Sequence, residues 1–222
     1  METPFLPQKG NYRNLIAYQK AECIYDITYY FAHHFLERSD RTIDQMVQAA
    51  RSGKQNIAEG CAASTTSAET EIKLVNVARA SLQELLIDYE DYLRVRNLTK
   101  WDINDRRAIV ARRVCTKHNE SSFYRDAIQV RTDETIANIA ITLIYQEDVI
   151  LRKYLDHIKE DFIKHGGIRE QMTRARIEYR NKQERTYNVQ DKHLLPHPPL
   201  PPPCRYFTRY LHNKEKLLCH TV

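Results

Sequence analysis

Glycine and proline are scarce in this chain of 222 residues. Glycine occurs five times, and no proline lies between Pro7 and Pro196. A β-rich domain of this length would use both residues at its turns. Helix interiors, in contrast, exclude proline and disfavour glycine. The two shortages together predict an all-α fold.

The sequence also lacks a long hydrophobic run. No stretch approaches the ~20 apolar residues that a membrane-spanning helix needs, and the charged opening does not resemble a signal peptide. The five cysteines are an odd number and widely spaced, which indicates free thiols in a reducing compartment rather than a disulfide framework. We therefore expect a cytoplasmic protein without a membrane partner.

Charge is distributed unevenly along the chain. Residues 1–163 hold 22 Lys and Arg against 24 Asp and Glu, a net charge of −2, whereas residues 164–222 hold 12 against 5, a net charge of +7. Such segregation is typical of a surface that attracts nucleic acid or an acidic partner. A solvated tail without a partner is the alternative interpretation.

Apolar residues recur at helical spacing in four long segments, at residues 12–37, 42–60, 66–98 and 133–162. The connections between the first three are short, which predicts an up-down four-helix bundle. Two residue pairs at a spacing of three, Thr42–Gln45 and Thr66–Glu69, fit capping boxes at the starts of the second and third segments. We expect the second helix to end at Gly60 and a small-residue loop to follow it.

The chain beyond Trp101 follows a different pattern. It predicts one extra short helix at residues 104–114 and a polar connection at residues 117–131. Gly166 and Gly167 should end the fourth long helix. A basic helical segment then covers residues 168–189, and six prolines in residues 195–203 predict an extended polyproline stretch. The predicted domains are a bundle at residues 1–165 and a basic, proline-rich extension at residues 166–222.

Polar residues gather on the facing sides of the second and third predicted helices. Ser52, Asn56 and Glu59 share one face of the second helix, and Ser81 and Glu84 share one face of the third. Buried polar side chains need hydrogen-bond partners. We interpret these five residues as a structural network that fixes the register of the two helices, in preference to a catalytic pair of glutamates.

The sequence contains no recognisable catalytic or metal-binding constellation. A di-metal bundle site uses Glu-x-x-His pairs, and none of the nine histidines has a glutamate three residues before it. Phosphate-binding loops and nucleophile elbows need glycines that the chain does not have. The histidines and cysteines of the last 30 residues surround a stiff proline run, so we predict no zinc site there. We expect no enzymatic activity, no cofactor and no metal.

Three stretches also carry a resemblance to a known family. Residues Asn14–Ala21, Asn56–Gly60 and Val77–Leu85 resemble, in order, the signature stretches of the four helix bundle protein family. This family includes proteins encoded in intervening sequences of large-subunit ribosomal RNA genes and accessory proteins of diversity-generating retroelements. Leu143–Gln146 and Gly166–Glu170 resemble its longer subgroup, which carries a C-terminal suffix domain.

The resemblance implies a non-enzymatic bundle that assembles as a homo-oligomer, commonly a ring-shaped pentamer, with proposed binding to nucleic acid. Tyrosines of the first helix, Tyr25, Tyr29 and Tyr30, suit either the edge of the core or a subunit interface.

The leading functional hypothesis is a nucleic-acid-binding accessory protein of low sequence specificity. Its phosphate contacts would come from the basic C-terminal segment, because clustered cations bind phosphates without a strict motif. The candidate residues are Arg169, Arg174, Arg176, Arg180, Lys182 and Arg185. The alternative is a protein-interaction scaffold, in which the prolines of Pro196–Pro203 bind an aromatic-lined groove of a partner protein.

Overall fold

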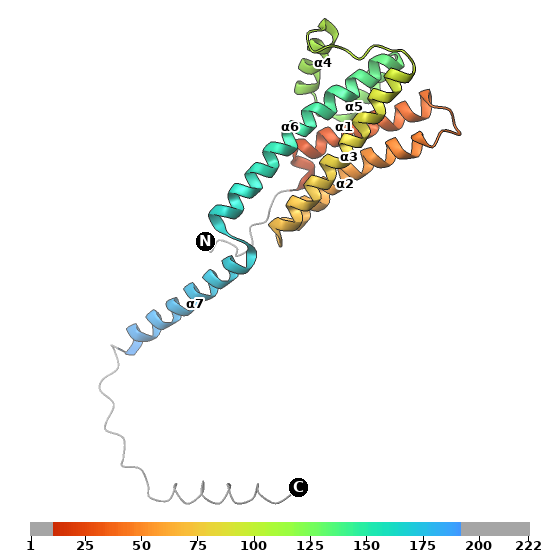
Figure 1. The fold of residues 1–222 in the computed structure, drawn as a ribbon. Helices are drawn as coiled ribbons and strands as arrows, with labels where there is room; N and C mark the ends of the chain where they lie inside the picture. The colour runs from red at the N-terminus through yellow and green to blue at the C-terminus, as the bar shows by residue number, and fades with distance from the viewer. Residues whose placement is uncertain (1–10, 192–222) are drawn as a thin grey trace, which may run out of the picture. The chain divides into compact units, whose positions relative to one another are not determined.

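The computed structural model describes residues 11–191, and this part of the chain is helical without any β-strand (Figure 1). The all-α prediction is confirmed. A short 3-10 helix, η1 (Tyr12–Asn14), precedes seven α-helices. They are α1 (Ile16–Phe35), α2 (Thr42–Ala63), α3 (Ala68–Val95), α4 (Arg106–Lys117), α5 (Ser121–Ile128), α6 (Asp133–His165) and α7 (Ile168–Asp191).

The four long helices α1, α2, α3 and α6 surround one hydrophobic core. Helix α1 packs against α2 and α6, and α3 packs against the same two helices. The largest fully buried side chains come from all four helices and include Phe31, Ile57, Tyr89 and Leu143. Burial of such side chains contributes about 1.5–3 kcal/mol each relative to exposure, so this core accounts for the packing of the long helices.

The two short helices lie outside this arrangement and close one side of it. Helix α5 packs on α1, and α4 packs on α6. Tyr124 and Ile128 of α5 are buried, and the Tyr124 hydroxyl donates a 2.9 Å hydrogen bond to the carbonyl oxygen of His118. The prediction of a polar connection at residues 117–131 was wrong for residues 121–128. These eight residues form a helix that buries two of its side chains.

The helix ends differ from the expected capping boxes. Ser67, not Thr66, caps α3 by accepting a 3.1 Å hydrogen bond from the amide of Thr70. In front of α2, Asp40 accepts a 2.8 Å hydrogen bond from the Thr42 amide, and no side chain caps the helix from the N-cap position, Arg41. Short acidic and hydroxyl side chains satisfy free helix amides equally well, so several neighbouring residues compete for the role.

Two glycines that were predicted to end helices occupy different positions in the structure. Gly166 ends α6 with φ at +73°, a conformation that side chains with a Cβ rarely adopt, as expected. Gly60 does not end α2, which continues to Ala63. It is buried beside Val75 of α3, within the contact between the two helices and not at a helix end.

Contacts divide the chain into two units, Met1–Ala175 and Arg176–Val222, with the division inside α7. The predicted division at Gly166 and Gly167 remains a prediction. Among the described helices, none is long and apolar enough to cross a membrane.

Candidate functional site

The facing surfaces of α2 and α3 bring three of the five predicted network residues together. The hydroxyl oxygens of Ser52 and Ser81 are 3.0 Å apart. The Asn56 amide donates to the Ser52 hydroxyl at 3.1 Å and to the Ser52 carbonyl oxygen at 2.9 Å. The Ser52–Ser81 hydrogen bond therefore connects the two helices, and Asn56 supports it from within α2.

Glu59 and Glu84 do not take part in this network. Both carboxylates are exposed, and neither has a hydrogen-bond or ion-pair partner within the described residues. Glu84 lies beside the serine pair in a shallow groove, whereas Glu59 is on the solvent side of α2. The prediction that both glutamates belong to the network was wrong, because Glu84, one turn from Ser81, and Glu59, two turns from Ser52, have exposed side chains outside the helix contact.

Helices α2 and α3 are in close contact at Gly53. A Cβ atom at this position would lie 2.8 Å from Leu82 Cγ and Cδ2, which is closer than carbon atoms pack in protein interiors. Glycine at residue 53 is therefore required by the contact with α3, and this contact places Ser52 within reach of Ser81.

All six predicted nucleic-acid-binding residues lie on α7 and are exposed. None forms an ion pair with another residue of the described part of the chain. Six Lys and Arg and four Asp and Glu give α7 a net charge of +2, so much of the positive charge predicted for the C-terminal quarter belongs to residues beyond 191.

The cations of α7 do not all lie on one face of the helix. At about 100° per residue, Arg176 and Arg180 lie about 40° apart on one face. Lys182 and Arg185 lie about 120° or more from Arg176, on the other side of the helix. In the first unit, Arg169 and Arg174 are likewise about 140° apart. The α7 cations therefore surround the helix instead of following one face.

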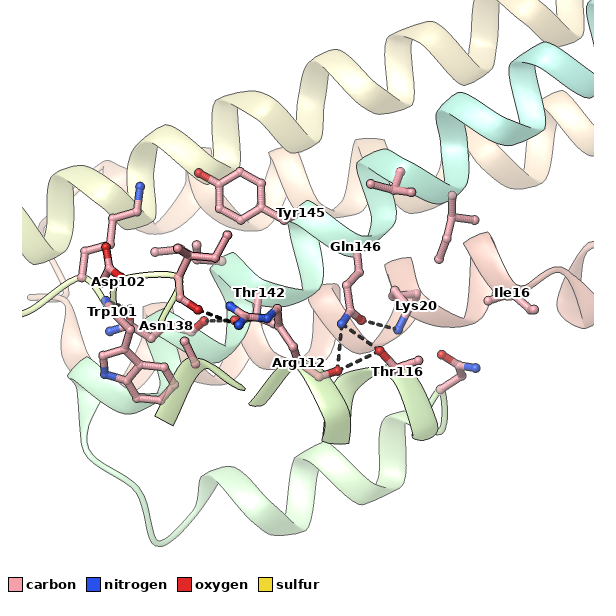
Figure 2. A pocket seen from close by; sticks show the side chains of 17 residues that line it. Ile16, Lys20, Trp101, Asp102, Arg112, Thr116, Asn138, Thr142, Tyr145 and Gln146 are labelled. Atoms are coloured by element: carbon pink, nitrogen blue, oxygen red, sulfur yellow. Dashed lines mark hydrogen bonds between the residues drawn. The ribbon is translucent and has the colours of Figure 1, made fainter. Parts of the chain in front are cut away.

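A groove of about 1000 Å³ runs between α1, α4, α6 and the connection that precedes α4 (Figure 2). Ile16 and Lys20 of α1 lie at one end, and Trp101 and Asp102 lie at the other. Arg112 of α4 is located between the two ends. The long helix α6 forms one wall of the groove along its length, with both apolar and amide side chains.

Lys20 is the most unusual residue of this groove. Its side chain is 2% exposed, and its ammonium donates to the Cys115 carbonyl oxygen at 2.7 Å and to Gln146 Oε1 at 3.3 Å. Gln146 is held in this orientation because its amide donates to the Arg112 carbonyl oxygen at 3.0 Å. No carboxylate of the described residues lies within ion-pair distance of Lys20. Burial lowers the pKa of its ammonium, because desolvation disfavours the charged form.

A second buried ionisable group, Glu147, follows Gln146 on α6. It is fully buried, and neither carboxyl oxygen has a hydrogen-bond partner among the described residues. Burial raises the pKa of this carboxyl well above its ordinary value, and the positive charge of Lys20 opposes the shift only in part. This environment favours the protonated carboxyl over the ionised one.

Sequence reasoning missed Lys20 and Glu147, although a signal for both was present. Lys20 lies three residues after Ala17 and four before Ile24, and Glu147 lies between Leu143 and Leu151, so each occupies a core register position of an apolar helix face. A charged residue at such a position indicates a buried polar site. Arg112 and Gln146 carried no comparable signal, because they meet only through the packing of α4 on α6.

Two remaining predictions fall outside the described residues. The proline stretch Pro196–Pro203 lies there, as do all the histidines and cysteines of the last 30 residues. Within residues 11–191, no three His, Cys, Asp or Glu side chains are arranged so that they could hold a metal ion. The described cysteines Cys23, Cys61 and Cys115 are buried and free of disulfides.

Comparison with known proteins finds no family model that matches the chain, no similar curated protein and no similar solved structure. The resemblance to the four helix bundle protein family thus stays a prediction that rests on the three sequence stretches.

Proposed function

We propose that this protein is a non-enzymatic, nucleic-acid-binding accessory protein that contacts phosphates through the exposed cations of α7. One observation carries the proposal: six Lys and Arg side chains on one helix are exposed, and none is neutralised by an ion pair within the described residues. Free cations exchange their hydration for phosphate contacts and release the counterions condensed on the nucleic acid, which is the main source of non-specific affinity.

The distribution of the cations around α7 favours a flexible, single-stranded ligand. A rigid duplex would meet one face of the helix at a time, whereas a single strand can follow cations on several sides. Tyr179, which is 63% exposed, lies about 60° around the helix from Arg176. An exposed aromatic ring beside cations provides a stacking surface for an unpaired base, independent of sequence.

We also propose that α1, α2, α3 and α6 form an up-down four-helix bundle and that the protein is a homo-oligomer, with a pentamer as the form that the family resemblance implies. The contacts of each long helix with two of the others support the bundle. Exposed apolar side chains support the oligomer: Tyr29 of α1 is 51% exposed and Ile87 of α3 is 56% exposed.

The proposal is tested by two double variants that remove the same charge from different helices. Arg176→Gln with Arg180→Gln neutralises one face of α7, and Arg41→Gln with Arg51→Gln neutralises two exposed cations at the start of α2 and within it. Fluorescence anisotropy with a labelled single-stranded RNA measures the affinity of each.

We expect the α7 double variant to bind RNA about 100-fold more weakly than the wild type, since each of the two charge-assisted contacts contributes roughly 1.5 kcal/mol and each ~1.4 kcal/mol is a tenfold change in affinity. The α2 double variant should bind like the wild type. If instead the α2 variant loses affinity and the α7 variant does not, the interface lies on α2 and the proposal is wrong.

A further inference from the structure

The groove between α1, α4 and α6 has the size of a small-molecule site. Its volume is about 1000 Å³, at the upper end of the range of about 300–1000 Å³ that ligand pockets occupy. Apolar side chains form much of its surface, among them Ile141, Val149 and Ile150 of α6. A ligand that fills it therefore needs a substantial apolar body.

The polar groups of the groove carry positive charge without matching negative charge. Lys20 and Arg112 have no carboxylate within ion-pair distance among the described residues. Lys100, a third cation of the wall, differs because Glu90 neutralises it and also accepts a hydrogen bond from Tyr145. The carboxylate of the wall, Asp102, is exposed and lies at the end away from Lys20. The Lys20 end of the groove thus holds a buried ammonium without an ion-pair partner among the described residues, and the carboxyl that acts on it electrostatically, Glu147, makes no hydrogen bond with it.

Hydrogen-bonding capacity remains unused at the same end. The Lys20 ammonium has three donors, and two of them are occupied by uncharged acceptors. The Arg112 guanidinium donates to the Ile103 carbonyl oxygen at 2.6 Å and keeps further N–H groups for a second contact. Buried polar groups are normally satisfied, so this end is built for a polar ligand group.

We propose that this groove binds an amphipathic organic carboxylate, with the acid group on Lys20 and the apolar body along α6 towards Trp101. A carboxylate would supply the negative charge that the Lys20 ammonium lacks, and charge-assisted hydrogen bonds in a buried site are the strong ones. The positive charge of Arg112, between the two ends of the groove, adds to the attraction of the carboxylate (Figure 2). This inference goes beyond the nucleic-acid-binding function and does not depend on it, since no α7 residue lines the groove.

Two probes with the same apolar chain test the charge requirement. Dodecanoate carries a carboxylate and 1-dodecanol carries an uncharged hydroxyl, and isothermal titration calorimetry of the full chain measures both. We expect dodecanoate to bind at least about tenfold more tightly than 1-dodecanol, because only the anion forms an ion pair with the Lys20 ammonium.

Matched variants locate the binding. Val149 is 44% exposed in the wall, and Val77 is 47% exposed on α3 away from the groove, so both positions tolerate a carboxylate without loss of the fold. Val149 lies one helical turn after Gln146, on the same side of α6. Val149→Glu would therefore place a competing negative charge near Lys20.

A second pair of variants changes the cations. Arg112→Met removes a groove cation, and Arg113→Met removes its exposed neighbour outside the groove.

The proposal predicts that Val149→Glu and Arg112→Met each weaken dodecanoate binding about tenfold, while Val77→Glu and Arg113→Met change it less than about twofold. Three results would overturn it: no binding of dodecanoate to the wild type, equal affinities for dodecanoate and 1-dodecanol, or dodecanoate affinities of the two groove variants that match those of their controls.

Discussion

The ammonium of Lys20 on α1 donates a 2.7 Å hydrogen bond to the backbone carbonyl oxygen of Cys115 at the end of α4. This buried contact connects two helices through residues that are 95 positions apart in the sequence. It anchors a short helix that otherwise packs mainly on α6, and it fixes one end of the groove between α1, α4 and α6.

We expect Lys20→Met to lower the free energy of unfolding by about 1–3 kcal/mol, because the Cys115 carbonyl oxygen and Gln146 Oε1 lose a buried donor. Chemical denaturation of the two proteins measures the difference. The control is Lys73→Met, since Lys73 is an exposed partner of Glu69 and such pairs contribute about 1 kcal/mol or less. Equal stability of Lys20→Met and the wild type would show that the Lys20 contacts do not support the fold.

Glu147 should make stability depend on pH. Its folded-state pKa is raised above the ordinary 4.5 by burial. Between 4.5 and the raised pKa, the folded state retains a proton that the unfolded state has lost, so stability falls as pH rises through this window. Glu147→Gln removes the titration. We expect the stability of Glu147→Gln relative to the wild type to increase as pH rises from about 4.5 towards the raised folded-state pKa.

Denaturation curves at a series of pH values from acid to neutral measure this difference. Glu59→Gln is the matched control, because Glu59 is exposed on α2, and its difference from the wild type should stay constant across the series. A constant difference for Glu147→Gln as well would mean that the Glu147 carboxyl titrates alike in the folded and unfolded states.

Two glycines of α2 should respond oppositely to alanine. At Gly53 the added Cβ would lie 2.8 Å from Leu82 Cγ, so Gly53→Ala must displace the Leu82 side chain or separate α2 from α3, and should cost about 1–3 kcal/mol. At Gly60 the nearest atom, Val75 Cγ2, lies 3.4 Å from the new Cβ, an ordinary contact. Gly60→Ala should stabilise the protein by up to about 1 kcal/mol, through helix propensity. Thermal denaturation distinguishes the two, and a destabilised Gly60→Ala variant would contradict the packing described here.

The exposed apolar side chains of α1 and α3 predict a stable oligomer. Light scattering of the purified protein at micromolar concentration should give a mass that is a multiple of 26.3 kDa, five-fold if the family resemblance extends to assembly. Tyr29→Glu, which places a charge on the exposed face of α1, should dissociate the oligomer if this face is the interface. A monomeric mass for the wild type would contradict the oligomer prediction.

The positions of the long helices could be predicted from the sequence, because their apolar periodicity and the stop at Gly166 are local signals. Helix α5 could not, since its eight residues form a helix only through the burial of Tyr124 and Ile128. The serine pair of α2 and α3 was predictable from small polar residues on facing sides, but the exposure of Glu59 and Glu84 depends on the exact crossing of the helices. The groove depends on tertiary packing of α4 against α6, which no local pattern specifies.

The arrangement of charge on α7 shows the same limit. The sequence identified the six cations, and all six are exposed. Their distribution around the helix follows from the continuous α-helical geometry of Ile168–Asp191, which places Lys182 and Arg185 away from Arg176.

The salt dependence of RNA affinity tests the central claim most directly. Six substitutions to glutamine, at Arg169, Arg174, Arg176, Arg180, Lys182 and Arg185, neutralise the α7 cations and keep good helix formers at exposed positions. Each phosphate contact with a single strand contributes about −0.7 to the slope of log affinity against log salt. The account predicts that the slope of the six-fold variant is shallower than that of the wild type by about 4. Equal slopes for the two proteins would contradict it, because the α7 cations would then release no counterions.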